Sequence, residues 1–147
     1  MVSVSKSGKL DITWVADYET GNKIVDNDHK QIFELVKKVL DNAFENRTEK
    51  VNTSIEFLAQ YVLQHFANEE KLMDESNYPE AATHKALHSA FVKSVVALQE
   101  KVKKEGDTLN IGMEINTTVI GWLMDHVLGR DKLLAGHYKE WQKAQGK

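Results

Sequence analysis

The sequence predicts an all-α protein, an up-down-up-down antiparallel four-helix bundle formed by a single domain over residues 1–147. Apolar side chains recur at steps of three or four residues in four stretches, which keeps them on one face of a helix. The breaks between these stretches are short, so that consecutive helices are expected to lie antiparallel. One proline and eight glycines argue against a turn-rich all-β fold.

The four apolar stripes follow one another along the chain. They cover residues 29–43, 51–72, 84–102 and 111–126. We expect Asp26 to cap the first helix and Thr48 to cap the second, because both side chains can accept from the free N–H groups of a first turn. Pro79 suits the first turn of the third helix. The residues at the breaks are 46–48, 76–79 and 104–107.

Two segments flank the bundle, which is expected over about residues 26–131. Residues 1–25 are predicted to form an irregular arm with Trp14 and Tyr18 as anchors. After Gly129, residues 132–147 are predicted to form a short helical tail. Its apolar and aromatic side chains can pack back on the bundle end or meet a protein partner or a second copy; they are Leu134, His137, Tyr138 and Trp141.

Composition excludes several classes of function. A net charge of −3 and a pI near 6.1 do not suit a nucleic-acid surface. The absence of cysteine rules out disulfides, iron–sulfur clusters, thiolate zinc sites and a cysteine nucleophile. The polar start of the chain has no secretory signal, and no apolar run approaches the roughly 20 residues that span a bilayer. We therefore expect a cytoplasmic protein without a membrane anchor.

Polar side chains interrupt the stripes where a bundle should be apolar. They are His29, His65, Glu69, His84, His88 and His126. Burying a lone carboxylate costs several kcal/mol unless a positive group pairs with it, and no lysine or arginine falls on a stripe. A bound cation resolves the conflict, and imidazole with carboxylate is a good ligand set for iron, zinc or manganese.

The spacing of these residues also favours a metal site. His65 and Glu69 are four residues apart, as are His84 and His88, so each pair leaves one helix face. Asp131 follows Gly129, where a bend could turn it inward. Any one of these features alone is more often a core or surface feature, but their coincidence on four helices is not. Five imidazoles and two carboxylates suit two ions with bridging carboxylates, and this ligand set favours binding oxygen over oxidising C–H bonds.

The sequence resembles the hemerythrin family, and within it the bacteriohemerythrins, from about Trp14 to Tyr138. The resemblance rests on Trp14 with YETG (18–21), VDNDHK (25–30), HFANEE (65–70), YP (78–79) with HKALH (84–88), and WLMDH (122–126) with Asp131.

The resemblance implies a hemerythrin-like bundle around an oxo- or hydroxo-bridged di-iron centre that binds dioxygen without turnover. It assigns one iron to His84, His88 and His126. It assigns the other, with one open position, to His29 and His65, and makes Glu69 and Asp131 the bridges. It also implies an apolar oxygen pocket formed by Ile32, Phe66, Trp122, Leu123 and Val127.

Three residues near the motifs have no role in this pattern. The family often has Gln before the first ligand histidine, whereas this chain has Asp28, which we expect to face solvent unless it tunes the site. Glu70 is expected to be solvated, because it lies about 100° around the helix from Glu69. His137 matches no ligand position and is expected on the surface of the tail.

The leading hypothesis is reversible dioxygen binding for storage, delivery or sensing, and we expect no enzyme. One alternative is a sensory module that acts on a partner through the tail. Others are a di-iron enzyme of peroxide or nitric oxide chemistry, an iron-handling protein, or a structural zinc site.

Overall fold

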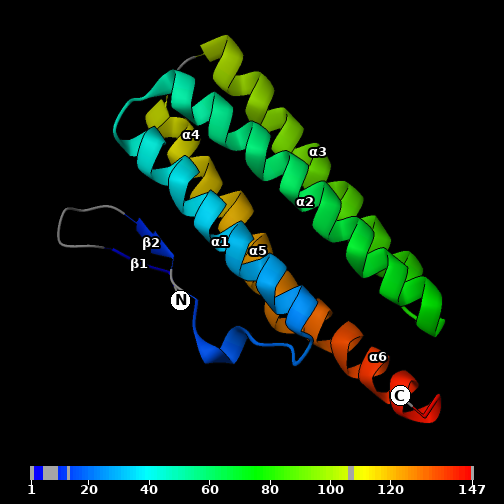
Figure 1. Ribbon diagram of the computed structural model, residues 1–147. Coiled ribbons are helices and arrows are strands. Elements are labelled where there is room, and N and C mark those ends of the chain that lie inside the picture. Colours follow the sequence, from blue (N-terminus) through cyan, green and yellow to red (C-terminus); the bar gives the residue numbers. More distant parts are fainter. Residues whose placement is uncertain (1, 5–9, 13, 106–107, 147) are drawn as a thin grey trace.

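Four helical rods pack side by side in antiparallel order (Figure 1). The computed structural model describes residues 2–4, 10–12, 14–105 and 108–146, so Gly106 and Asp107 of the predicted third break lie outside the described residues. The fourth rod is helical throughout but alternates α- and π-helical segments. The elements are α1 (Lys23–Phe44), α2 (Thr48–Ser76), α3 (Ala81–Glu105), and then α4 (Thr108–Glu114), η2 (Ile115–Ile120), α5 (Gly121–Asp125), η3 (His126–Asp131) and α6 (Lys132–Ala144). The all-α bundle is confirmed.

The helices begin at slightly different places from those predicted. The side chain of Asn22 caps α1 by accepting from two backbone N–H groups, so the helix starts before Asp26 and the predicted cap is wrong. The Asp26 carboxylate instead accepts two 2.8 Å hydrogen bonds from Thr20. Thr48 is the first residue of α2 and not its cap. Pro79 lies in the turn just before α3.

The N-terminal arm is not irregular throughout. Strands β1 (Val2–Val4) and β2 (Leu10–Ile12) form an antiparallel pair, and a 3₁₀ turn, η1 (Ala16–Tyr18), follows. Strands of three residues are too short for their alternation to stand out in a sequence. The anchors are confirmed: Trp14 and Tyr18 place their rings 5.2 Å and 5.4 Å from the ring of Phe33.

The core fills the space between the rods, as the stripes predict. The side chains of Ile111 and Ile115 in the fourth stripe lie outside the described part. All four rods contribute fully buried apolar residues; they include Val36, Val39, Leu40, Ala43, Val51, Val102, Val119 and Val127. Along the described segments, no helix has the length and apolar character needed to cross a membrane.

The C-terminal tail continues the fourth rod as α6 and packs against the end of α2. The Nε2 of His137 donates to the backbone oxygen of Ser76 at 2.9 Å, and the Tyr138 hydroxyl donates to Glu75 at 3.1 Å. His137, expected on the surface of the tail, is therefore half-buried and bonded to the end of α2. Leu134 is fully buried, so it cannot belong to a docking surface for a partner.

Candidate metal centre

All seven predicted ligands converge at one level of the bundle. Each of the seven side chains is at most 3% exposed. In contrast, the remaining histidine, His137, and most other carboxylates of the chain are at least partly exposed. Every rod contributes at least one side chain. The contributions are His29 from α1, His65 and Glu69 from α2, His84 and His88 from α3, and His126 and Asp131 from η3.

The seven residues form two overlapping groups. In each group, one candidate ligand atom per residue lies within 4.8 Å of all the others. The first group joins three histidines to the two carboxylates, and the second joins two histidines to the same two carboxylates. Glu69 and Asp131 therefore belong to both. The groups are Glu69, His84, His88, His126 and Asp131, and His29, His65, Glu69 and Asp131.

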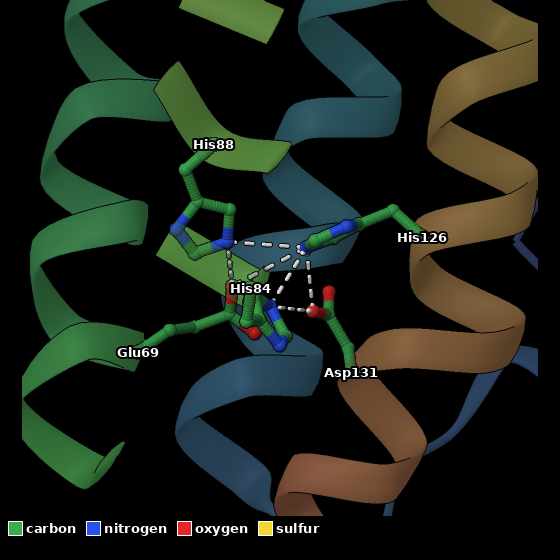
Figure 2. A group of neighbouring side chains, drawn as sticks. All are labelled: Glu69, His84, His88, His126 and Asp131. Carbon is green, nitrogen blue, oxygen red and sulfur yellow. Dashed lines mark hydrogen bonds and ion pairs between the residues drawn. The ribbon is translucent and has the colours of Figure 1, made fainter. Parts of the chain in front are cut away.

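Three imidazole nitrogens face one another in the larger group (Figure 2). The Nε2 of His126 lies 3.0 Å from that of His84 and 3.1 Å from that of His88. Two nitrogens that bind one ion at about 2.1 Å and at a right angle to each other lie about 3.0 Å apart. The spacing therefore suits three nitrogens on one face of an octahedral ion.

Each carboxylate reaches both groups. Glu69 Oε1 lies 3.1 Å from the Nε2 of His88 and 3.4 Å from that of His65. Asp131 places one oxygen 2.8 Å from the Nε2 of His126 and the other 2.7 Å from that of His29. This arrangement lets each carboxylate serve two ions.

Unsatisfied polar atoms point to a missing positive charge. Both oxygens of Glu69, both of Asp131 and the Nε2 atoms of His29 and His65 are buried and make no well-aligned hydrogen bond, although several of them lie close to one another. Buried polar atoms in folded proteins nearly always have a partner, so this concentration needs an explanation. Among the residues whose burial is described, no lysine or arginine is buried beside them. The donor set therefore fits metal ions.

The electrostatics of the metal-free protein reflect the same need. Burial would raise the pKa of Glu69, but contacts from His126, His84 and His88 hold that pKa well below its usual value. Burial would lower the pKa of His126, yet the Asp131 and Glu69 carboxylates raise it to about 9. Without metal, a protonated His126 thus supplies part of the positive charge that the two buried carboxylates require.

A π-helical turn brings Asp131 into the site. In an α-helix a residue five positions after His126 would lie about 140° away from it. The η3 segment is π-helical, and its wider turn brings residue i+5 back beneath residue i. The inward position of Asp131 was predicted correctly, but the predicted bend at Gly129 is wrong, because the helix continues through that residue without a break.

A small apolar cavity adjoins the two-histidine group. Its volume is about 10 Å³, close to the smallest space that holds one water molecule. All five residues predicted for the pocket line it: Ile32, Phe66, Trp122, Leu123 and Val127. Val62 and Phe91 also line it. Both fall on apolar stripes of the sequence, at residues 51–72 and 84–102, where nothing distinguishes them from the rest of the core.

Two carboxylates expected to face solvent instead contact ligand histidines. The Asp28 carboxylate lies 2.9 Å from the Nδ1 of His65, and its side chain is only 15% exposed. Glu70 lies 3.5 Å from the Nδ1 of His88, at the limit of a hydrogen bond. Burial would raise the pKa of Asp28, but hydrogen bonds from His65 and Asn68 lower it below its usual value.

An aromatic side chain from the arm also reaches the site. The Trp14 ring lies 6.3 Å from the imidazole of His29, and the Phe66 ring stacks on that of His88 at 3.7 Å. Trp122 stacks in the same way on His126 at 4.2 Å. The two stacked rings restrict the orientation of His88 and His126 by packing, which leaves few rotamers open to them.

Comparison with known proteins finds the same architecture elsewhere. The bacteriohemerythrin of Stenotrophomonas maltophilia (strain R551-3) is 30% identical over 128 residues, which cover 87% of this chain and 82% of that protein. The bacteriohemerythrin of Methylococcus capsulatus is 31% identical over 123 residues, covering 83% and 92%. A crystal structure of wild-type hemerythrin superposes with a TM-score of 0.76 at 30% identity, covering 86% of this chain and 97% of that one.

A family description matches as well. The profile of the hemerythrin HHE cation binding domain matches residues 20–138. That span begins before His29 and ends after Asp131, so it contains both groups of candidate ligands. Because the match covers most of the chain and the relatives share its length and its fold, this protein belongs to the hemerythrin family.

Proposed function

We propose that this chain binds dioxygen reversibly at a pair of iron ions, for storage, delivery or sensing of oxygen. The observation that carries the proposal is the convergence of five imidazoles and two shared carboxylates, with unsatisfied ligand atoms, in an otherwise apolar bundle. Family membership supports iron as the metal.

Each of the two groups of candidate ligands would hold one iron ion. In this proposal His84, His88 and His126 hold one iron, while His29 and His65 hold the other, and Glu69 and Asp131 are common to both. Ferrous ions held by these residues would supply the electrons that dioxygen takes up reversibly. Both imidazoles of the smaller group, His29 and His65, line the cavity, whereas only His126 of the larger group does.

The cavity walls protect the bound gas. Apart from His29, His65, His126 and Asp131, which belong to the metal groups, the lining side chains are aliphatic or aromatic. Such walls exclude water and protons, which slows irreversible oxidation. They also provide no separate acid or base for turnover, which favours binding over catalysis of peroxide or nitric oxide reactions.

Metal content and the absorption spectrum test the proposal together. Protein reconstituted with ferrous iron under argon should hold two irons per chain. Its visible absorption should rise in air and return to the starting spectrum under argon over repeated cycles. Iron pairs without an oxygen-dependent, reversible spectrum would contradict oxygen carriage. Steady consumption of peroxide or nitric oxide by the reduced protein would favour the enzymatic alternative.

A further inference from the structure

The outer nitrogens of the five candidate ligand histidines are treated unequally. The Nδ1 atoms of His29, His84 and His126 are buried and have no hydrogen-bond partner among the described residues. That of His88 is 3.5 Å from Glu70. Only His65 has a carboxylate at short range, since Asp28 Oδ2 lies 2.9 Å from its Nδ1.

The Asp28 carboxylate is itself held in place. Asn68 donates to its Oδ2 at 3.2 Å and the Tyr61 hydroxyl donates to its Oδ1 at 3.3 Å. Gln64 orients the Asn68 amide by donating to its oxygen at 3.1 Å. Three side chains of α2 therefore donate to the Asp28 carboxylate of α1: Tyr61, His65 and Asn68. This is more organisation than a surface charge needs, because an exposed carboxylate is satisfied by water.

The position of Asp28 ties it to one ion of the proposed pair. It directly precedes His29 in α1 and contacts His65 in α2, and these are the two histidines of the smaller group. A carboxylate that accepts from Nδ1–H keeps the Nε2 lone pair of His65 directed at the metal position and makes the imidazole a stronger donor. The group with one imidazole fewer thus gains negative charge through His65.

We infer that Asp28 is a positioning residue for the oxygen-binding half of the centre: it orients His65 and strengthens its bond to the ion held with His29. This inference rests on the proposed function. It predicts that removing the charge at position 28 weakens the two-histidine site selectively and makes the oxidised state of the iron there less stable.

Stepwise titration of the metal-free protein with Co²⁺, a coloured stand-in for Fe²⁺, tests the first consequence. Asp28→Asn keeps the size and one acceptor oxygen but removes the charge. We expect the second Co²⁺ to bind tenfold to a hundredfold more weakly than in the natural chain, with the first unchanged. The matched control is Asp26→Asn, which makes the same charge change two residues earlier, where the carboxylate contacts Thr20. It should leave both steps unchanged.

The reduction potential of the iron-loaded protein tests the second consequence. It should rise in Asp28→Asn, because the oxidised ion loses a negative charge that stabilised it, and Asp28→Glu should restore it at least in part. A purely structural role for Asp28 would not produce an upward shift reversed by the longer acid.

The outcomes separate the two proposals. If the natural chain binds two Co²⁺ ions and Asp28→Asn binds the second equally well, the positioning role is overturned and the proposed function stands. If the natural chain does not bind two ions, both fail. Should circular dichroism show Asp28→Asn unfolded, Asn68→Ala decides, because it keeps the charge but removes one donor. It should weaken the second ion by less than tenfold, and an unchanged affinity would overturn the inference.

Discussion

Two histidines of contrasting position offer a sharp test of the assignment, His65 inside the metal centre and His137 outside it. His65 supplies one of only two imidazole nitrogens in its group. His65→Ala should therefore lower the iron content from two per chain to one and abolish the oxygen-dependent spectrum. The apolar cavity wall offers no side chain that could replace the lost ligand.

His137→Ala should leave both properties intact but lower stability. It removes the 2.9 Å hydrogen bond to the Ser76 carbonyl that docks α6 on α2. A hydrogen bond of this kind contributes about 1 kcal/mol, which corresponds to a fall in Tm of about 3 °C for a chain of this length. Iron analysis, visible absorption and calorimetry of both variants give the three readouts.

Equal effects of the two substitutions on iron content would refute the reasoning. If both variants lost iron, the centre would depend on general stability of the bundle. If neither did, His65 would not be a ligand, despite lying within 3.4 Å of Glu69 in a group of candidate donors.

Three further predictions follow from the same geometry, one of them with a control substitution. Ile32→Ala should cost about 2–5 kcal/mol and speed the loss of the oxygenated spectrum in air, as water enters the cavity. Ile55→Ala, equally buried but ten residues before His65 in α2, should cost as much stability without changing that rate. Glu69→Gln, with the same shape but no charge, should prevent binding of an iron pair while far-UV circular dichroism stays unchanged. The metal-free protein should lose resistance to urea as pH rises. Because the folded pKa of His126 is about 9 and its unfolded pKa about 6.5, its contribution is complete below about pH 6.5 and is lost through pH 9. A urea midpoint that stays constant or rises over this interval would contradict that interpretation.

Much of the fold and most of the candidate site could be predicted from the sequence, because both depend on helical periodicity. Apolar steps of three and four residues locate the rods, and the polar exceptions on the same faces locate the candidate ligands. His65 with Glu69, and His84 with His88, needed only the geometry of one helical turn. The family motifs then placed Asp131 and the five cavity residues.

The errors arose where the outcome depends on contacts between elements. Asp28 looks like a solvated acid because periodicity places it off the stripe, and only the approach of α2 brings Tyr61 and Asn68 to it. His137 contacts a carbonyl that lies 61 residues earlier in the chain. The cap of α1 also depends on local competition, since both Asn22 and Asp26 have side chains suited to the role.

The wide turn of η3 has a consequence for how this chain tolerates change. Leu128, Gly129 and Arg130 face outward, and the wide turn holds one residue more than an α-helical turn would. Ordinary α-helical winding over the same residues would turn Asp131 about 140° away from His126 and out of the bundle. A chain shortened by one residue here could wind as an α-helix and still bring both side chains to one face, as His65 and Glu69 show at a spacing of four. At this place the length of the chain and the width of the helical turn can therefore change only together.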